Sequence, residues 1–208
     1  MILDIPKALL SPFSDDKWKS KLFILTLLAV VSLFLLFPFW IFIGYCLQFM
    51  HNEIHNIKPL LPDWHSNFVK YLKYGVVYFI VISIFLILNF LIIFPFIKSF
   101  NVAFTIYMFI FSIINFAILC LYSDKLKFSE AFYLKNFLEL ISRVQWEFLI
   151  LILIMSLPTI ILYFWVPLIA KIQLYKTIII VISYLLYPFT TLILYNLIAQ
   201  TYKKAREL

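Results

Sequence analysis

Charged residues are scarce in this sequence. Of its 208 residues, only 13% are Asp, Glu, Lys or Arg, whereas 65% are hydrophobic and 20% are aromatic. A soluble domain has about 25% charged residues and roughly 45–50% apolar residues. A single globular core cannot bury this excess. The composition therefore excludes an ordinary soluble domain and indicates that the solvent of this chain is lipid.

Glycine and cysteine are also rare. The two cysteines, Cys46 and Cys120, lie near the ends of apolar segments, and their spacing supports neither a disulfide nor a metal pair. The chain lacks GxSxG and HExxH motifs, and no apolar segment carries a pair of aspartates. In a membrane protein, acid–base and nucleophilic catalysis need such groups close together, at the same depth in the bilayer. We therefore expect no enzymatic activity, no bound metal and no cofactor.

The net charge of +7 is the one feature that could indicate nucleic-acid binding. The basic residues lie between the apolar runs, however, as in cytoplasmic loops that face anionic lipid headgroups. We therefore expect the lipid bilayer as a partner and no nucleic acid.

Four apolar segments have the length of a membrane span, which is about 20 residues. They are roughly 74–97, 101–122, 148–170 and 177–200. None contains an Asp, Glu, Lys, Arg or His, and short turns join them in pairs. The sequence therefore predicts two helical hairpins, 74–122 and 148–202.

Amphipathic stretches precede the hairpins. Residues 1–21 predict a short interfacial helix, capped by Asp4 and anchored at the headgroups by Trp18. Residues 51–73 predict a cytoplasmic linker that ends in an interfacial helix, and 123–147 predict a second amphipathic linker. The apolar stripe expected in that second linker consists of Leu134, Phe137, Leu138, Ile141, Val144 and Phe148.

The apolar run 22–50 is too long for one comfortable span and too short for two. Pro38 should break it, so we expect a broken or re-entrant hairpin with its apex near 37–40. In that arrangement, all but three of the 17 Lys and Arg residues lie on one side, with both termini cytoplasmic. A single kinked helix, which gives five spans, is the alternative.

The linker 51–73 contains all three histidines of the chain. His51 and His55 would share one face of a helix, and a metal site with His65 or Asp63 is geometrically conceivable. The simpler interpretation is that these are polar residues at a helix end near the membrane interface. We expect no metal and leave the role of the three histidines open.

Several short motifs along the chain resemble one known family. They are Ser11-Pro12-Phe13 with Asp15 or Asp16 and Trp18, then Pro38, Gly44-Tyr45, Leu61-Pro62-Asp63-Trp64, and Gly75. Their order and spacing resemble domain-of-unknown-function family 4013 of small bacterial and archaeal multi-pass membrane proteins. The resemblance implies membrane character over essentially the whole chain and supplies no reaction. The family usually has Arg-rich residues where this chain has His51-Asn52-Glu53.

We interpret eight of these residues as a structural motif. They are Pro38, Gly44, Tyr45, Leu61, Pro62, Asp63, Trp64 and Gly75. The fold expected is an all-α integral membrane protein with four full transmembrane helices plus the broken N-terminal hairpin. We expect a non-catalytic accessory, assembly or scaffolding subunit of the cytoplasmic membrane that contacts lipid, a membrane-protein partner or a second copy of the chain. The alternative is a small-solute transporter or channel-like permease.

Overall fold

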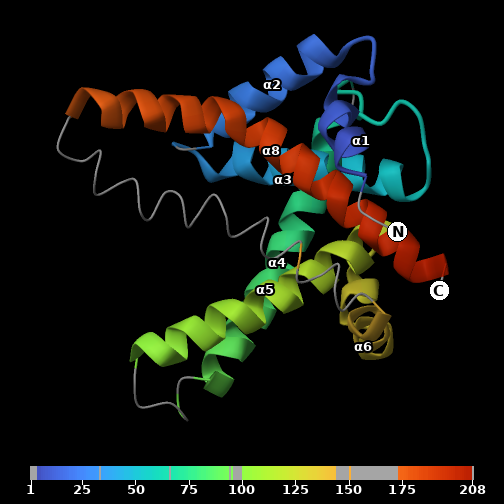
Figure 1. Cartoon of the computed structure of the whole chain (residues 1–208), viewed down its shortest axis with the longest axis vertical. Coiled ribbons are helices and arrows are strands. Elements are labelled where there is room, and N and C mark those ends of the chain that lie inside the picture. The colour runs from blue at the N-terminus through green and yellow to red at the C-terminus, as the bar shows by residue number, and fades with distance from the viewer. Residues whose placement is uncertain are drawn as a thin grey trace.

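The structure is a computed structural model of the whole chain, shown in Figure 1. It describes residues 4–32, 34–65, 67–93, 95, 100–143, 150 and 173–207. Within these ranges every regular element is a helix and no strand occurs, as the sequence predicts. The expected span 148–170 lies outside the described residues, apart from residue 150.

The N-terminal segment folds as α1, Ile5–Leu10, followed by a short 3-10 turn, η1, over Ser11–Phe13. The Asp4 side chain accepts a hydrogen bond from the backbone N–H of Lys7 at 2.9 Å. This is the predicted N-cap, and Pro6 fits the first turn because its missing N–H would have no partner there.

The apolar run 22–50 is divided between two helices, α2 over Trp18–Val31 and α3 over Leu36–Ile54. The predicted apex near 37–40 is therefore wrong, because the chain turns before it, between the two helices. Pro38 lies in the first turn of α3, where an N–H has no partner within the helix and proline is tolerated. The proline marks the start of α3 rather than a break.

The next two helices are α4, Phe68–Ile93, and α5, Phe100–Lys125, which pack against each other. The expected interfacial helix at the end of linker 51–73 is continuous with α4. Within the described ranges, α4 is the one helix that is long and apolar enough to cross a membrane. Only 22% of its most apolar window is buried, whereas the core helix of a soluble protein is mostly buried.

The connection after α5 contains the 3-10 helix η3, Phe128–Phe132, and the helix α6, Leu134–Arg143. The amphipathic helix is present, but its apolar stripe is partly misassigned. Leu140 is buried at 5% exposure, whereas Leu138 is 58% exposed. The inward face follows the contact with α5, which the periodicity of a ten-residue helix specifies only loosely.

The last helix, α8, runs over Gln173–Glu207 and extends beyond the predicted span at both ends. The central helix is α3, which packs against α2, α4 and α8. In Figure 1, α4 and α5 leave the centre together in one direction, while the N-terminal half of α8 leaves in another beside α2 and α3. The C-terminal half of α8 crosses the centre and lies beside α1.

Candidate functional site

The two glycines of the chain lie where α3 crosses α4. A Cβ atom on Gly44 would come closer than 3.0 Å to the carbonyl oxygen of Tyr71, and one on Gly75 would come as close to that of Trp40. Real Cβ atoms do not approach backbone oxygens in this way. The two helices therefore touch through their backbones, and only glycine fits at either position.

Three aromatic rings surround this crossing, and we call them the aromatic cluster. Tyr45 of α3 stacks on Trp64 with a centroid distance of 4.1 Å and an angle of 11°. Tyr71 of α4 meets both rings edge-on, at 5.5 Å from Tyr45 and 5.7 Å from Trp64. Rings arranged in this way contribute about 0.5–1.5 kcal/mol per pair beyond their buried area.

The segment Leu61–Trp64 is bound to two helices by hydrogen bonds as well. The indole N–H of Trp64 donates to the backbone carbonyl of Lys21 at 3.1 Å. The hydroxyl of Tyr71 donates to the carbonyl of Asp63 at 2.6 Å. The segment therefore joins α2 to α4 and covers the crossing between α3 and α4.

A buried ammonium lies beside this segment, in a group that we call the Lys21 cluster. Lys21 donates to a carboxylate oxygen of Asp15 at 2.9 Å, to one of Asp63 at 2.7 Å, and to the carbonyl of Leu61 at 2.8 Å. An ammonium group has three N–H donors, so this set of acceptors satisfies all of them. Burial alone would lower the pKa of Lys21, but the two carboxylates outweigh it and raise that pKa.

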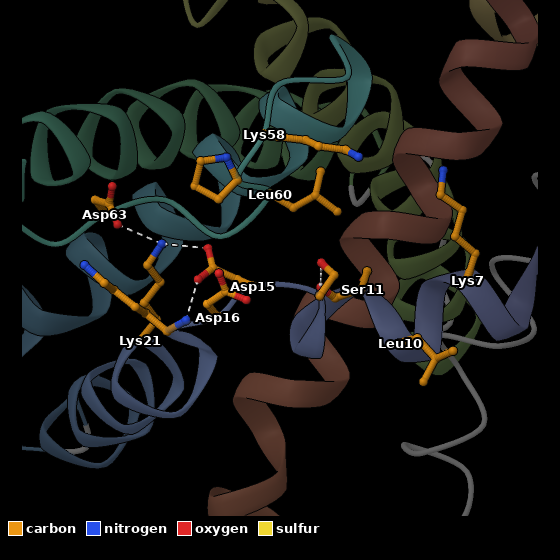
Figure 2. A pocket seen from close by; sticks show the side chains of 12 residues that line it. Lys7, Leu10, Ser11, Asp15, Asp16, Lys21, Lys58, Leu60 and Asp63 are labelled. Carbon is orange, nitrogen blue, oxygen red and sulfur yellow. Dashed lines mark hydrogen bonds and ion pairs between the residues drawn. The ribbon is translucent and has the colours of Figure 1, made fainter.

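A groove of about 830 Å³ opens next to the Lys21 cluster. Figure 2 shows that its walls come from α1, η1, the start of α2 and the loop before α4. The lining residues are Lys7, Leu10, Ser11, Ser14, Asp15, Asp16, Lys17, Lys21, Lys58, Pro59, Leu60 and Asp63. The groove thus has a polar wall with more lysines than carboxylates and a short apolar rim.

A second group of charges lies at the C-terminal end of α5, and we call it the Asp124 cluster. The carboxylate of Asp124 accepts from Arg206 at 2.7 Å and from the hydroxyl of Tyr202 at 3.2 Å, both on α8. His55 Nε2 lies 3.1 Å from the same carboxylate and 2.8 Å from the Asp124 carbonyl oxygen. This cluster joins α3, α5 and α8.

His51 and His55 form hydrogen bonds with backbone carbonyls at the C-terminal end of α5. His51 Nδ1 donates to the backbone carbonyl of Ser123 at 2.8 Å, and His55 Nε2 donates to the backbone carbonyl of Asp124. The last carbonyls of a helix have no partner within it, so these rings satisfy them from another helix. Burial lowers the pKa of His51, which favours its neutral form.

The metal hypothesis finds no support in this geometry. In the part of the chain that the structure describes, no group of three or more His, Cys, Asp or Glu side chains could hold a metal ion. The ring nitrogens of His51 and His55 described above already contact carbonyl oxygens. His65 lies in the exposed turn before α4.

Glu53 connects the two ends of the chain. Its carboxylate is buried and pairs with Lys7 of α1 at 2.8 Å, while Lys203 of α8 lies 3.9 Å away. Lys203 also donates to the backbone carbonyl of Glu53 at 3.0 Å and to Asn56 at 2.7 Å. The N-terminal segment, the loop after α3, the end of α5 and the end of α8 therefore meet at one place.

The structure brings together seven of the eight predicted motif residues, through the glycine crossing, the aromatic cluster and the segment Leu61–Trp64. Pro38 lies apart from them, in the first turn of α3. The sequence does not predict that four charged side chains are buried, namely Lys21, Asp15, Glu53 and Asp124. Only Asp15 carried a signal, since it belongs to the motif that ends at Trp18.

A family model described as "Protein of unknown function (DUF4013)" matches residues 27–171. The matched range includes the glycine crossing and the segment Leu61–Trp64, and it leaves out the motif over residues 11–18. No curated protein and no solved structure matches the chain.

Proposed function

This chain belongs to the DUF4013 family, and on that premise we propose that it is a non-catalytic, multi-pass protein of a bacterial or archaeal cytoplasmic membrane. It acts as an accessory, assembly or scaffolding subunit that contacts membrane-protein partners or lipid. It has four spans plus a re-entrant α2–α3 hairpin, and both termini are cytoplasmic. The observation that carries the proposal is the meeting of four charged segments at one place.

The ion pairs favour the hairpin over a single crossing. The hydrocarbon core of a bilayer is about 30 Å thick, so a single crossing by 22–50 would separate the segments before and after it by at least that distance. Instead, Lys7 lies 2.8 Å from Glu53 and Lys21 lies 2.7 Å from Asp63. These contacts support the placement of both segments on the same side of the membrane.

The size of the hairpin also agrees with re-entry. The helix α2 has 14 residues, so it is about 21 Å long at a rise of about 1.5 Å per residue. It is therefore too short to cross the hydrocarbon core. At the turn after α2, Phe34 is 82% exposed and Leu36 is 71% exposed. Side chains of this kind are stable at the turn only if lipid or a partner surrounds them.

The backbone of the turn is suited to lipid. The N–H of Ser32 donates to the carbonyl of Leu28 at 2.9 Å, and the N–H groups of Phe34 and Leu35 donate to that of Val31 at 3.0 and 3.1 Å. Proline at position 38 removes another donor from the start of α3. The turn therefore satisfies the N–H groups of Ser32, Phe34 and Leu35 itself, whereas the start of α3 has no side-chain cap.

Cysteine labelling tests the topology. Single cysteines at Ser14, Ile57 and Phe34 report on the N-terminal segment, the loop after α3 and the turn of the hairpin, and all three residues are exposed. The native Cys46 and Cys120 are both buried and serve as the unlabelled background. We expect a membrane-impermeant maleimide to label the first two positions from the cytoplasmic side only and position 34 from neither side. Labelling of position 34 from outside would contradict the re-entrant hairpin.

Co-purification tests the function. The tagged full chain, extracted from native membranes in a mild detergent, should retain a partner chain in stoichiometric amount through wash steps. The matched control is a tagged multi-pass protein of similar abundance from the same membranes. A lone protein that gives solute flux in liposomes would contradict the subunit proposal and support the permease.

A further inference from the structure

Two lysines in the groove beside the Lys21 cluster form no ion pair among the described residues. Lys17 and Lys58 line it, and neither side chain makes a hydrogen bond or ion pair with any residue that the structure describes. The other two lysines of the lining are paired, Lys7 with Glu53 and Lys21 with Asp15 and Asp63. The groove therefore presents two ammonium groups outside any ion pair, beside the carboxylate of Asp16.

The rim of the same groove is apolar. Leu10 lines it and is 66% exposed. Ile5, Leu9 and Phe13, from the same short helical segment, are exposed as well. Trp18, at the start of α2, packs edge-on against Phe13 at 5.0 Å, which places an indole beside this surface. Exposed apolar residues next to lysines and a tryptophan are typical of the headgroup region of a membrane.

We propose that this groove binds one anionic glycerophospholipid, with the phosphate held between Lys17 and Lys58 and the acyl chains along the apolar rim at Leu10. Asp16 also lines the groove, and its carboxylate accepts a hydrogen bond from a hydroxyl of the headgroup. A headgroup with one negative charge and free hydroxyls, such as that of phosphatidylglycerol, matches these three side chains. This inference rests on the proposed membrane location and names the lipid class that the subunit binds.

Charge complementarity favours this ligand over the alternatives. A zwitterionic choline headgroup carries no net charge and no hydroxyl for Asp16. A free phosphate ion would leave the exposed rim at Leu10 without a contact. A phospholipid with an anionic, hydroxyl-bearing headgroup uses both the lysine pair and the rim.

The test uses the purified, delipidated full chain in a mild detergent at fixed salt. Phosphatidylglycerol, phosphatidylethanolamine, phosphatidylcholine and glycerol 3-phosphate are each titrated, and the unfolding temperature is followed by tryptophan fluorescence. We expect phosphatidylglycerol to raise the unfolding temperature in a saturable way. The other three should give less than half of that rise at the same concentration.

The variants locate the effect. In the double variant Lys17→Ala/Lys58→Ala, the half-saturating concentration of phosphatidylglycerol should rise at least about tenfold, since one lysine near an anionic lipid is worth about fivefold in affinity. The control Lys73→Ala/Lys127→Ala removes the same charge at exposed sites outside the groove and should leave it unchanged. Lys17→Gln/Lys58→Gln repeats the measurement should the alanine variant lose stability without lipid.

Several results would overturn the proposal. They are an equal loss in the control, an equal rise with phosphatidylcholine or phosphatidylethanolamine, an equal rise with glycerol 3-phosphate, and no rise with any lipid. None of them affects the co-purification of a partner chain, so the lipid site and the proposed function can fail separately.

Discussion

The Lys21 cluster and the Asp124 cluster are arranged with opposite charge. In the first, a cation is held by two carboxylates and a carbonyl. In the second, a carboxylate is held by an arginine, a histidine and a tyrosine. Each cluster joins elements that are far apart in the sequence.

The two clusters differ in burial. In the Lys21 cluster, Lys21 and Asp15 are 5% and 6% exposed and only Asp63, at 63%, is open to solvent. In the other cluster the central Asp124 is 10% exposed, but its charged partner Arg206 and the His55 ring are 52% and 37% exposed. A charge that loses its partner in a dry site cannot be solvated, but one in a half-exposed site can. The Lys21 cluster should therefore be the more sensitive to substitution and the Asp124 cluster the more sensitive to solution conditions.

The largest effect is expected from disrupting both clusters at once. Gly44→Ala adds a Cβ against the backbone of Tyr71 and forces α3 away from α4. His55 of the Asp124 cluster directly follows α3, and Asp63 of the Lys21 cluster lies in the segment between α3 and α4. We expect a loss of at least about 3 kcal/mol, the upper end of the overpacking range. The readout is the unfolding temperature in detergent together with the amount of protein in the membrane. Val30→Ile, which likewise adds one carbon atom but at a partly exposed site on α2, is the control, and an equal loss there would contradict the glycine crossing.

The second-largest effect is expected from removal of the buried ammonium group of Lys21. Lys21→Met keeps most of the side-chain volume but leaves Asp15 buried without a cation, which costs about 3–5 kcal/mol for a buried pair. The unfolding temperature should fall well below that of Lys19→Met, since Lys19 is exposed and its substitution should stay within about 0.5 kcal/mol. Similar values for the two variants would show that Lys21 is solvated and not buried.

A smaller loss is expected at the second cluster. Asp124→Asn removes the charge that Arg206 and His55 share, but water can reach both partners, so we expect about 1–2 kcal/mol. Glu207→Gln, at an exposed site near the end of α8, is the control. A loss as large as that of Lys21→Met would break the distinction between the two clusters.

The smallest expected effect is a change in the stability of the folded chain with pH. The lowered pKa of His51 means that the unfolded chain binds a proton more readily than the folded chain. The stability that neutral His51 contributes is therefore complete at a pH above 6.5, the ordinary pKa of histidine, and is lost as pH falls below that value. His55 and Asp124 are the titratable groups that face His51.

We expect the unfolding temperature to fall modestly between pH 7 and about pH 5, and less in His51→Gln. Asp63 of the Lys21 cluster should not respond in this range. The hydrogen bond from Lys21 lowers the pKa of Asp63, so that carboxylate stays charged until pH falls below its ordinary value of 3.8. An unchanged slope in His51→Gln would assign the pH response to another group.

The sequence predicted the local features of the fold well. The cap at Asp4, the amphipathic character of α6 and the pairing of α4 with α5 all follow from short-range patterns, and the structure contains each. The turn between α2 and α3 was misplaced because it contains neither glycine nor proline. The visible proline at position 38 is compatible with the first turn of a helix.

The buried charges could not be predicted from the sequence. Lys17, Lys19 and Lys21 are equivalent in a linear reading, and each looks like a headgroup anchor. Burial of Lys21 depends on a carbonyl 40 residues away at Leu61, which only the folded chain brings close. The glycines and the tryptophan that the sequence singles out lie at or beside the crossing of α3 and α4, while the charges that bind these segments together were not predicted.

The bonds between α1 and α8 have a consequence for synthesis. The N–H of Asp4 donates to the Gln200 side chain at 3.0 Å, and that side chain donates back to the Asp4 carbonyl at 3.2 Å. Glu53 and Asp124 likewise receive Lys203 and Arg206 from the last turns of α8. A ribosome must therefore translate α8 before the contacts between the N-terminal segment and that helix can form. Until then, Glu53 lacks Lys203 and Asp124 lacks Arg206, so each carboxylate has fewer cationic neighbours than in the folded chain.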